Sequence, residues 1–527
     1  MNYYQKILIM FLILYLIFLV YKLDYKNFMW DETYVAAPVI FWLDFIKYFL
    51  NNPTLNINKI ISYGLNYQSH YIFFSQMLWH PPLYKILVFF SLILFGINEF
   101  AARLPSVFFS IMGLFFTYLI GKEISSKKFI GLISAIFLGL SPLYYQFSRV
   151  CTPDIPVVVM ITISMFFLLR YLKHKKRKDS ILFGLFFGLS LLTKEFAISI
   201  ILSSFLFILL TKKYKLLKDK NIYFSYFLAG VIFIPWLLFV NFIPSFLDIP
   251  YVFIEKYGSH MGFNVSLHNL PIFYLKQFSY VIGFLSILGL IYLIKRREDS
   301  DFFLISWIVV FYLFPLLFIG PSSSNLHRFT MPIMPALAIS GSIFMNKVVN
   351  FNKIKNYGSV IFILTLILSL LVSIDYNLRV NIRYPVENAT IWTLQNTEKN
   401  GGILYDDKGI QFYFMKHDRN LSVRTAECTS KECIFQFLYQ EYSKFEYEKL
   451  GIKNPKFYYL IVKEPLMQSN NFFKKIDDKD IYTTEQSFFE ELFEYINQNK
   501  NLFKLKRIFY GNRPDANVFL YEIIEID

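Results

Sequence analysis

Long apolar runs recur through most of this chain, and they limit its possible folds more than any other feature. From Ile7 to Ile374, one stretch after another is long enough to cross a bilayer. A segment in lipid must satisfy its own backbone hydrogen bonds, so these runs can form helices but not open sheets. Because 55% of the residues are hydrophobic and 20% are aromatic, the sequence predicts an all-α polytopic membrane domain.

Short basic clusters separate the apolar runs. They lie at residues 173–178, 212–215, 295–297 and 347–355. By the positive-inside rule these clusters face the cytoplasm, so the formal charge of +15 indicates topology and not nucleic-acid binding. The sequence predicts a multi-pass protein of the cell membrane with about 11 spans, a cytoplasmic N-terminus and an external C-terminus. Leu83–Phe95 is too short for a span, and we expect it to lie in the interface or to re-enter.

The composition changes from about Asp375, where charges become frequent and apolar runs short. Strand-like stretches occur at Gly402–Tyr405, Phe457–Val462, Phe503–Phe509 and Val518–Ile523. Helical patterns occur at Val386–Glu398, Glu432–Leu450 and Gln486–Asn499. The sequence therefore predicts a membrane domain over residues 1–375 and an extracytoplasmic α/β domain over residues 376–527, which is long enough to bury its own core.

Two adjacent carboxylates, Asp31 and Glu32, follow the first apolar run within Met29-Trp30-Asp31-Glu32-Thr33-Tyr34. At the membrane face they can be reached by a lipid headgroup, and a hydroxyl nucleophile there needs a base. A solvated interfacial turn is the alternative. We interpret the pair as the start of an active site.

Further motifs follow in a recognisable order. They are Trp79-His80-Pro81-Pro82-Leu83-Tyr84, Glu99 to Ser106, Ser141-Pro142, Thr152-Pro153-Asp154, Thr193-Lys194 and His327-Arg328-Phe329 before Met331 to Pro335. This series resembles the membrane glycosyltransferases of the GT-C class, in the branch shared by the protein O-mannosyltransferases and the aminoarabinose transferases that modify lipid A. The resemblance covers roughly the first 340 residues, and each motif alone is short.

The resemblance implies an enzyme that moves a sugar from a polyprenyl-phosphate carrier to a hydroxyl on a protein, lipid or glycan. Transfer would take place on the extracytoplasmic face, with inversion and without a nucleotide-sugar domain. The sequence agrees on the last point, since it has no Rossmann-like repeat and no Gly-rich phosphate loop. The implied partners are the donor lipid, the acceptor and the bilayer, with no nucleic acid.

Three carboxylates take catalytic roles under this resemblance. Asp31 matches the family's first acidic position and would be the base that takes the acceptor's proton. Glu32 would position the acceptor or a metal ion. Asp154 matches the second acidic position, and its alternative role is the N-cap of a helix that begins at Ile155.

Several cations could hold the departing phosphate. They are Arg103, Arg149, Lys194 and Arg328. Lys194 interrupts an apolar stretch with two basic ends, so a helix pair must turn near it. Alternatives stay open, because Lys194 could snorkel towards water beside Glu195, Arg328 could be an interfacial anchor, and Arg103 could pair with Glu99 on one helix.

His80 precedes a rigid Pro81-Pro82 pair and is a further candidate for substrate binding. Some relatives use this region as a metal site, so a divalent metal ion is a possible cofactor. The candidate ligands are Asp31, Glu32, His80 and Asp154. A histidine that is hydrogen-bonded at the interface is the alternative.

Two other classes of protein remain as alternatives. A polyprenyl-linked glycan flippase or transporter would need ionisable groups near the bilayer midplane, and often internal repeats. A non-catalytic membrane scaffold would display the C-terminal domain and would need no converging acids and cations. Among enzymes, the nearest competitor is a ligase that transfers a whole glycan.

Overall fold

The structure is a computed structural model, and its contacts divide the chain into two compact units. It describes residues 3–25, 27–28, 30–51, 80–246, 279–318, 326–350, 358–380, 386–397, 402–405, 409–417, 424–427, 457–463, 495–496, 498, 500, 503–509 and 518–523. The first unit comprises residues 1–21, 78–84 and 103–380. The second comprises residues 22–77, 85–102 and 381–527. The predicted boundary near residue 375 stays a prediction.

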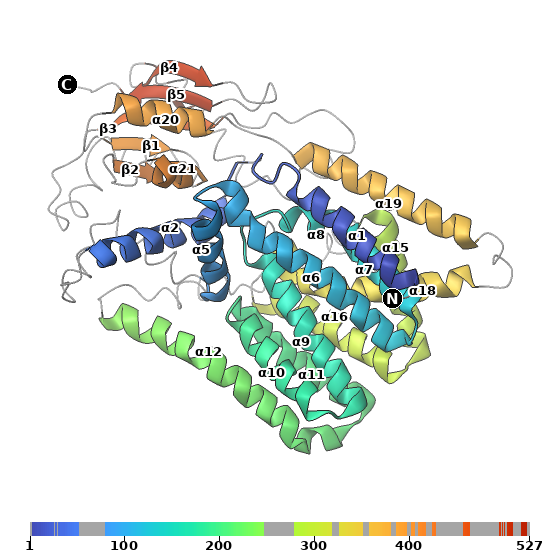
Figure 1. Ribbon diagram of the computed structural model, residues 1–527. Helices are drawn as coiled ribbons and strands as arrows, with labels where there is room; N and C mark the ends of the chain where they lie inside the picture. The colour runs from blue at the N-terminus through green and yellow to red at the C-terminus, as the bar shows by residue number, and fades with distance from the viewer. Residues whose placement is uncertain are drawn as a thin grey trace. The chain divides into compact units, whose positions relative to one another are not determined.

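Helices make up the first unit in the part that is described. They are α1 (Tyr3–Val20), α6 (Glu99–Ser125), α7 (Lys128–Gly139), α8 (Pro142–Phe147), α9 (Asp154–His174), α10 (Arg177–Leu191), η1 (Glu195–Ile198), α11 (Ser199–Thr211), η2 (Tyr214–Lys218), α12 (Lys220–Phe246), α15 (Tyr280–Arg296), α16 (Asp299–Phe318), α17 (Leu326–Thr330), η3 (Met331–Ile333), α18 (Met334–Val349) and α19 (Gly358–Val380). Figure 1 shows α9, α10 and α11 side by side, and α10 packs against both α9 and α12.

Six helices in the described ranges are long and apolar enough to cross a membrane. They are Tyr3–Val20, Glu32–Asn51, Glu99–Ser125, Asp154–His174, Lys220–Val240 and Arg328–Val349. The prediction of a mostly helical membrane protein is confirmed, and the count of about 11 spans stays a prediction. Leu83–Phe95 forms a helix, α5, of 13 residues, and its place in the interface or as a re-entrant segment stays a prediction.

Small residues let neighbouring helices of the first unit approach closely. Where α15 crosses α18, a Cβ atom on Gly289 would lie 2.3 Å from the carbonyl oxygen of Ser340, and one on Gly341 would lie 2.9 Å from Oγ of Ser286. The hydroxyl of Ser340 also donates to the carbonyl of Ser286 at 3.1 Å. This is the small-residue packing that joins helices in lipid, where burial of apolar surface gives no driving force between them.

We expect Gly289→Val to destabilise the first unit. The new side chain would overlap backbone atoms of α18, which cannot move aside as a flexible side chain can, at a cost of about 1–3 kcal/mol or more. Gly230→Val on α12 is the matched control, because the nearest atom to its added Cβ is Ile234 Cδ1 at 3.7 Å. Thermal unfolding in detergent measures the difference, and equal melting temperatures for the two variants would contradict the packing argument.

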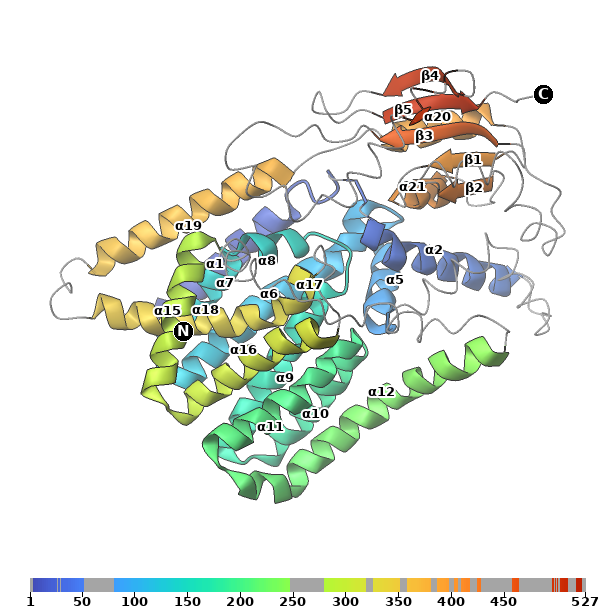
Figure 2. The same cartoon turned by 180° about the vertical axis from the view of Figure 1, so that it is seen from behind.

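A mixed five-stranded sheet lies in the second unit. The strands are β1 (Gly402–Tyr405), β2 (Arg424–Glu427), β3 (Phe457–Lys463), β4 (Phe503–Phe509) and β5 (Val518–Ile523), in the order β2-β1-β3-β5-β4 (Figure 2). β1 is parallel to β2 and β3, and β5 is antiparallel to β3 and β4. The four predicted strands are confirmed, whereas β2 was not predicted. The predicted helix at 432–450 and nearly all of that at 486–499 lie outside the described residues.

Helices complete the described part of the second unit. They are α2 (Trp30–Asn51), most of α5 (Leu83–Phe95), α20 (Val386–Asn396) and α21 (Gly409–His417). α20 packs on β4 and β5, and α21 packs on α2. The ring of Phe28 stacks on that of Phe412 with centroids 3.8 Å apart, and the hydroxyl of Tyr413 accepts from the amide of Phe28 at 3.3 Å. These contacts hold the chain just before Asp31.

An ion-pair cluster joins α20, α21 and the start of α6 within the second unit. Lys416 Nζ lies 2.7 Å from a carboxylate oxygen of Glu387 and 3.5 Å from one of Glu99. His417 Nε2 lies 2.8 Å from the same oxygen of Glu387. Burial raises the pKa of Glu387, but the hydrogen bonds from Lys416 and His417 outweigh it, so this pKa lies below its usual value.

The depressed pKa of Glu387 predicts a stability change in acid. Such a group stabilises the fold fully above its unfolded pKa of about 4.3, and the contribution is lost as pH falls through the lower folded pKa. We expect wild type to melt higher than Glu387→Gln at neutral pH, and the difference to shrink as pH falls below about 4. Thermal melting of both proteins over this pH range checks it. A difference that grows in acid would contradict the assignment.

Candidate functional site

Helix α9 begins at Asp154, in the segment that carries the second acidic motif. Pro153 occupies the N-cap position, so the alternative that Asp154 caps a helix beginning at Ile155 is wrong. The preceding turn is fixed by Ser106, whose hydroxyl donates to the carbonyl of Val150 at 2.8 Å. The side chain of Asp154 is only 1% exposed, and a buried carboxylate needs charged or hydrogen-bonding partners.

Lys194 supplies one of those partners. The apolar hairpin breaks here, because α10 ends at Leu191 and the short helix η1 begins at Glu195, which confirms the predicted turn. The ammonium of Lys194 donates to Oδ1 of Asp154 at 2.8 Å and lies 4.3 Å from the ring centroid of Phe329. The Lys194 side chain is 5% exposed, so it does not snorkel into water.

Arg328 supplies the second partner from α17. Its Nε and one terminal nitrogen donate to Oδ2 of Asp154 at 3.1 and 2.7 Å. The Arg328 side chain is 10% exposed, which is too buried for a simple interfacial anchor. Its guanidinium carbon lies 5.7 Å from the ring centroid of Phe147, so aromatic faces flank both cations of the site.

Asp154, Lys194 and Arg328 form what we call the buried triad. Each carboxylate oxygen accepts from a different cation, and such charge-assisted hydrogen bonds fix the positions of both donors. The two cations and one carboxylate of the triad sum to a charge of +1, and all three side chains are largely shielded from water. A site of this kind can accept an anion without a large rearrangement, because its positive groups are already oriented.

The residues that follow the Pro81-Pro82 pair make hydrogen bonds in the same region of the first unit. The amide of Leu83 donates to the carbonyl of Leu192 at 3.1 Å, two residues before Lys194. The hydroxyls of Tyr84 and Ser106 lie 2.7 Å apart. Leu83 and Tyr84 are therefore hydrogen-bonded, directly or through Ser106, to the segments that lead into Lys194 and Asp154.

The first acidic motif lies in the second unit, in the first turn of α2. Glu32 is fully buried, so a solvated turn is wrong for this residue. The side chain of Asp31 lies outside the described side chains. Lys85, on α5 of the same unit, is only 1% exposed and was not predicted. The sequence could have identified Lys85 as a candidate site residue, because it lies within the apolar run Leu83–Phe95 and a charge in such a run indicates a functional position by default.

Arg149 and Arg103, two of the predicted phosphate-binding cations, are not part of the buried triad. Arg149 donates to the hydroxyl of Tyr145 and to the backbone carbonyl of Tyr21, both at 2.8 Å. It thereby holds the end of α8 to the chain after α1. Arg103 is buried in α6, while Glu99, its predicted neighbour on that helix, pairs with Lys416. A phosphate-binding role for Arg103 and Arg149 stays a prediction.

The described residues include no group of three or more His, Cys, Asp or Glu side chains that could hold a metal ion. Asp154 was one candidate ligand, but both of its oxygens already accept from Lys194 and Arg328. Its donor set therefore fits a metal poorly. The other candidates are His80, Glu32 and Asp31, and a metal bound by them stays a prediction.

Solved structures with the same arrangement of elements identify the fold. ArnT from Cupriavidus metallidurans in the apo state aligns with 99% of this chain and 99% of its own, with a TM-score of 0.61 and 13% identity. The same protein bound to undecaprenyl phosphate aligns with a TM-score of 0.59, 12% identity and coverage of 98% and 97%. This chain has the GT-C glycosyltransferase fold. The predicted resemblance is confirmed.

Other comparisons agree with a GT-C protein. Residues 79–239 match the family model described as dolichyl-phosphate-mannose-protein mannosyltransferase. This range contains Asp154 and Lys194 of the buried triad. The Archaeoglobus fulgidus oligosaccharyltransferase, crystallised with Zn and sulfate, aligns with 84% of this GT-C chain and 64% of its own, with a TM-score of 0.51 and 14% identity.

One curated relative of this GT-C chain carries a specific name. It is the undecaprenyl phosphate-alpha-4-amino-4-deoxy-L-arabinose arabinosyl transferase of Wigglesworthia glossinidia brevipalpis, 26% identical over 258 residues, which cover 46% of this chain and 45% of the relative. The chain spans about half the length of the curated relatives it matches.

Proposed function

We propose that this protein is an integral membrane glycosyltransferase. It moves a sugar from a polyprenyl-phosphate carrier to a hydroxyl acceptor on the extracytoplasmic face, with inversion. The observation that carries the proposal is the buried triad, because two fixed cations with one carboxylate suit a phosphate that gains negative charge as it leaves. The fold shared with a protein crystallised with undecaprenyl phosphate supports the same donor class.

In the proposed reaction, Asp31 takes the proton of the acceptor hydroxyl. The hydroxyl oxygen then attacks the anomeric carbon from the side opposite the leaving group, and the polyprenyl phosphate departs with the bonding electron pair. Lys194 and Arg328 stabilise the negative charge on that phosphate. Asp154 acts as a positioning residue in this scheme, because its two oxygens hold both cations in place before the substrate arrives.

Glu32 and His80 take supporting roles in the proposal. Glu32 positions the acceptor or a divalent metal ion, and His80 contributes to the donor site from its Pro-Pro turn. A second candidate function is a flippase or transporter of polyprenyl-linked glycans, since a site for the same phosphate could serve transport. The two differ in product, because only a transferase forms a new glycosidic bond.

The proposed topology follows from the basic loops. It has about 11 spans, with the N-terminus in the cytoplasm and an α/β domain over residues 376–527 outside. In this orientation Arg328 and the start of α9 lie at the outer face. The carrier's hydrocarbon tail then stays in lipid, and only its phosphate and sugar enter the protein.

The phosphate assignment predicts a graded loss of activity at Lys194. Lys194→Met keeps the apolar stem and removes the charge, so we expect it to lower turnover by about 100-fold or more, as the loss of one preorganised donor does in other enzymes. Lys194→Arg should retain part of the activity. Transfer from a purified polyprenyl-phosphate sugar, divided by the folded yield from size-exclusion chromatography, measures the effect.

Lys213→Met is the matched control, since Lys213 lies just beyond the other end of α11 and pairs with an exposed aspartate, Asp299. We expect it to retain wild-type turnover. If Lys194→Met folded and transferred sugar normally while Arg328→Met abolished transfer, Arg328 alone would hold the phosphate. If mass spectrometry of the purified protein found no polyprenyl phosphate and the wild-type protein transferred no sugar from the polyprenyl-phosphate donor, the transferase proposal would fail.

A further inference from the structure

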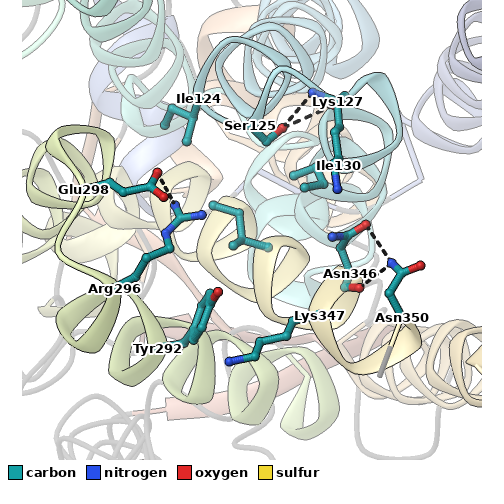
Figure 3. Close-up of a pocket in the computed structure, with 11 residues that line it drawn as sticks. Ile124, Ser125, Lys127, Ile130, Tyr292, Arg296, Glu298, Asn346, Lys347 and Asn350 are labelled. Carbon is teal, nitrogen blue, oxygen red and sulfur yellow. Dashed lines mark hydrogen bonds and ion pairs between the residues drawn. The ribbon is translucent and has the colours of Figure 1, made fainter. Parts of the chain in front are cut away.

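A polar cavity lies in the first unit, and no residue of the buried triad lines it. It has a volume of about 610 Å³ and is formed where α6 ends, α7 begins, and α15 and α18 end. Figure 3 shows Lys127, Asn346 and Asn350 on one side and Arg296 and Tyr292 on the other. Its size falls within the roughly 300–1,000 Å³ typical of small-ligand sites.

The cavity carries an excess of positive charge. Its three basic residues are Lys127, Arg296 and Lys347, and among them only Arg296 has a carboxylate within ion-pair distance in the described structure. Arg296 lies 3.5 Å from Glu298, and its Nε donates to the buried Asp301 at 2.9 Å. Lys347 lies over the ring of Tyr292, 4.0 Å from the centroid. Two lysine charges therefore remain available to an anionic ligand.

The floor of the cavity is apolar. Ile124, Ile130 and Ile343 line it and are nearly fully buried, whereas Lys127 and Lys347 are exposed at its rim. Asn346 and Asn350, which are hydrogen-bonded to each other, add amide groups that can bind hydroxyls. Cations beside an apolar floor match the point in a phospholipid where the phosphate joins the acyl chains, and they suit a free phosphate less well.

The candidate span that runs from α17 through η3 to the end of α18 places this cavity at headgroup depth. Arg328–Val349 counts 22 residues as one candidate span, about 33 Å as a helix, which is close to the roughly 30 Å of a hydrocarbon core. Arg328 of the buried triad begins this span, and Lys347 of the cavity lies near its end. The two sites therefore belong to opposite faces of the membrane, whichever face is outside.

We propose that this cavity binds the headgroup of an anionic phospholipid in the leaflet opposite the buried triad. The lipid phosphate would lie between Lys127, Lys347 and Arg296, and its glycerol or headgroup hydroxyls would reach Asn346 and Asn350. The bound lipid would join the ends of α6, α7, α15 and α18, which pack elsewhere through small residues. This inference does not depend on the identity of the sugar or of its acceptor.

Titration of the full-length protein in a non-ionic detergent with dihexanoyl phosphatidylglycerol, followed by native mass spectrometry, tests the proposal. We expect Lys127→Gln combined with Lys347→Gln to weaken lipid binding by about 10- to 30-fold, because the loss of each lysine alone should weaken it by less than about tenfold. The control combines Lys128→Gln with Lys295→Gln. It removes the same charge from exposed neighbours that do not line the cavity, and should change binding by less than about twofold.

Two further probes separate the possible sources of the phosphate. Dihexanoyl phosphatidylcholine carries the phosphate without net negative charge, and glycerol phosphate carries it without acyl chains, so both should bind more weakly than phosphatidylglycerol. If both double variants bound phosphatidylglycerol equally weakly, general surface charge would explain the binding, and the proposal would be overturned. Binding of glycerol phosphate as tight as that of the lipid would assign the cavity to a soluble anion and also overturn it.

Discussion

Replacing Asp31 with asparagine is expected to lower sugar transfer by about two to four orders of magnitude, the range usual for loss of a general base. Asparagine has nearly the same shape as aspartate but cannot take the acceptor's proton. Asp31 lies in the first turn of α2, a helix held by the stacking of Phe28 on Phe412, so the fold should survive the change. The rate of transfer from a polyprenyl-phosphate sugar measures the loss.

Asp44→Asn provides the matched control for this prediction. It makes the same chemical change on the same helix, more than three turns further along, and should leave transfer within about threefold of wild type. Binding of the donor lipid should be similar in Asp31→Asn and wild type, because the base acts on the acceptor. Near wild-type turnover by Asp31→Asn would show that another group takes the proton.

Replacing Asp154 with asparagine is expected to destabilise the protein as well as inactivate it. Lys194 and Arg328 would then both lose the carboxylate that each contacts at 2.8 and 2.7 Å in the buried site. Removing one partner from a buried ion pair costs about 3–5 kcal/mol, because the remaining charge stays desolvated. The melting temperature in detergent and the folded yield should both fall.

A double variant separates the two effects at Asp154. Asp154→Asn with Lys194→Met returns the net charge of the triad to +1, so stability should recover in part while transfer stays low. Asp179→Asn is the control, since this buried carboxylate lies 3.4 Å from Arg170, where α9 ends and α10 begins. It should lower stability and leave turnover per folded molecule close to wild type. A double variant no more stable than Asp154→Asn would contradict the charge-balance argument.

The sequence predicted those parts of the fold that depend on local signals. The length of an apolar run sets whether a helix can cross lipid, and α5 with its 13 residues is as short as its run indicated. A lysine inside an apolar stretch predicted the break between α10 and η1. Short stretches rich in apolar residues predicted four strands, whereas β2 reads Arg-Thr-Ala-Glu, with a charge at each end and one small apolar residue, so it gives no apolar pattern to detect.

The same local signals predicted Asp154, Lys194 and Arg328 individually as site residues. A charged group beside an apolar run is costly in lipid and therefore usually has a function. Their pairing could not be predicted. Asp154 lies 40 positions from Lys194 and 174 from Arg328, and no periodicity links residues so far apart. Only the packing of α9 against α10 and η3 brings the carboxylate between its two cations.

The sequence by itself therefore determined the membrane class, the helical segments and the candidate charges, since each depends on neighbouring residues and on the cost of polar groups in lipid. The tertiary structure decided which charges meet, the strand order β2-β1-β3-β5-β4 and the burial of Lys85 and Glu32. It also decided that Lys127 and Lys347 share one cavity. These properties depend on contacts between segments distant in the chain, and only a folded chain brings such segments together.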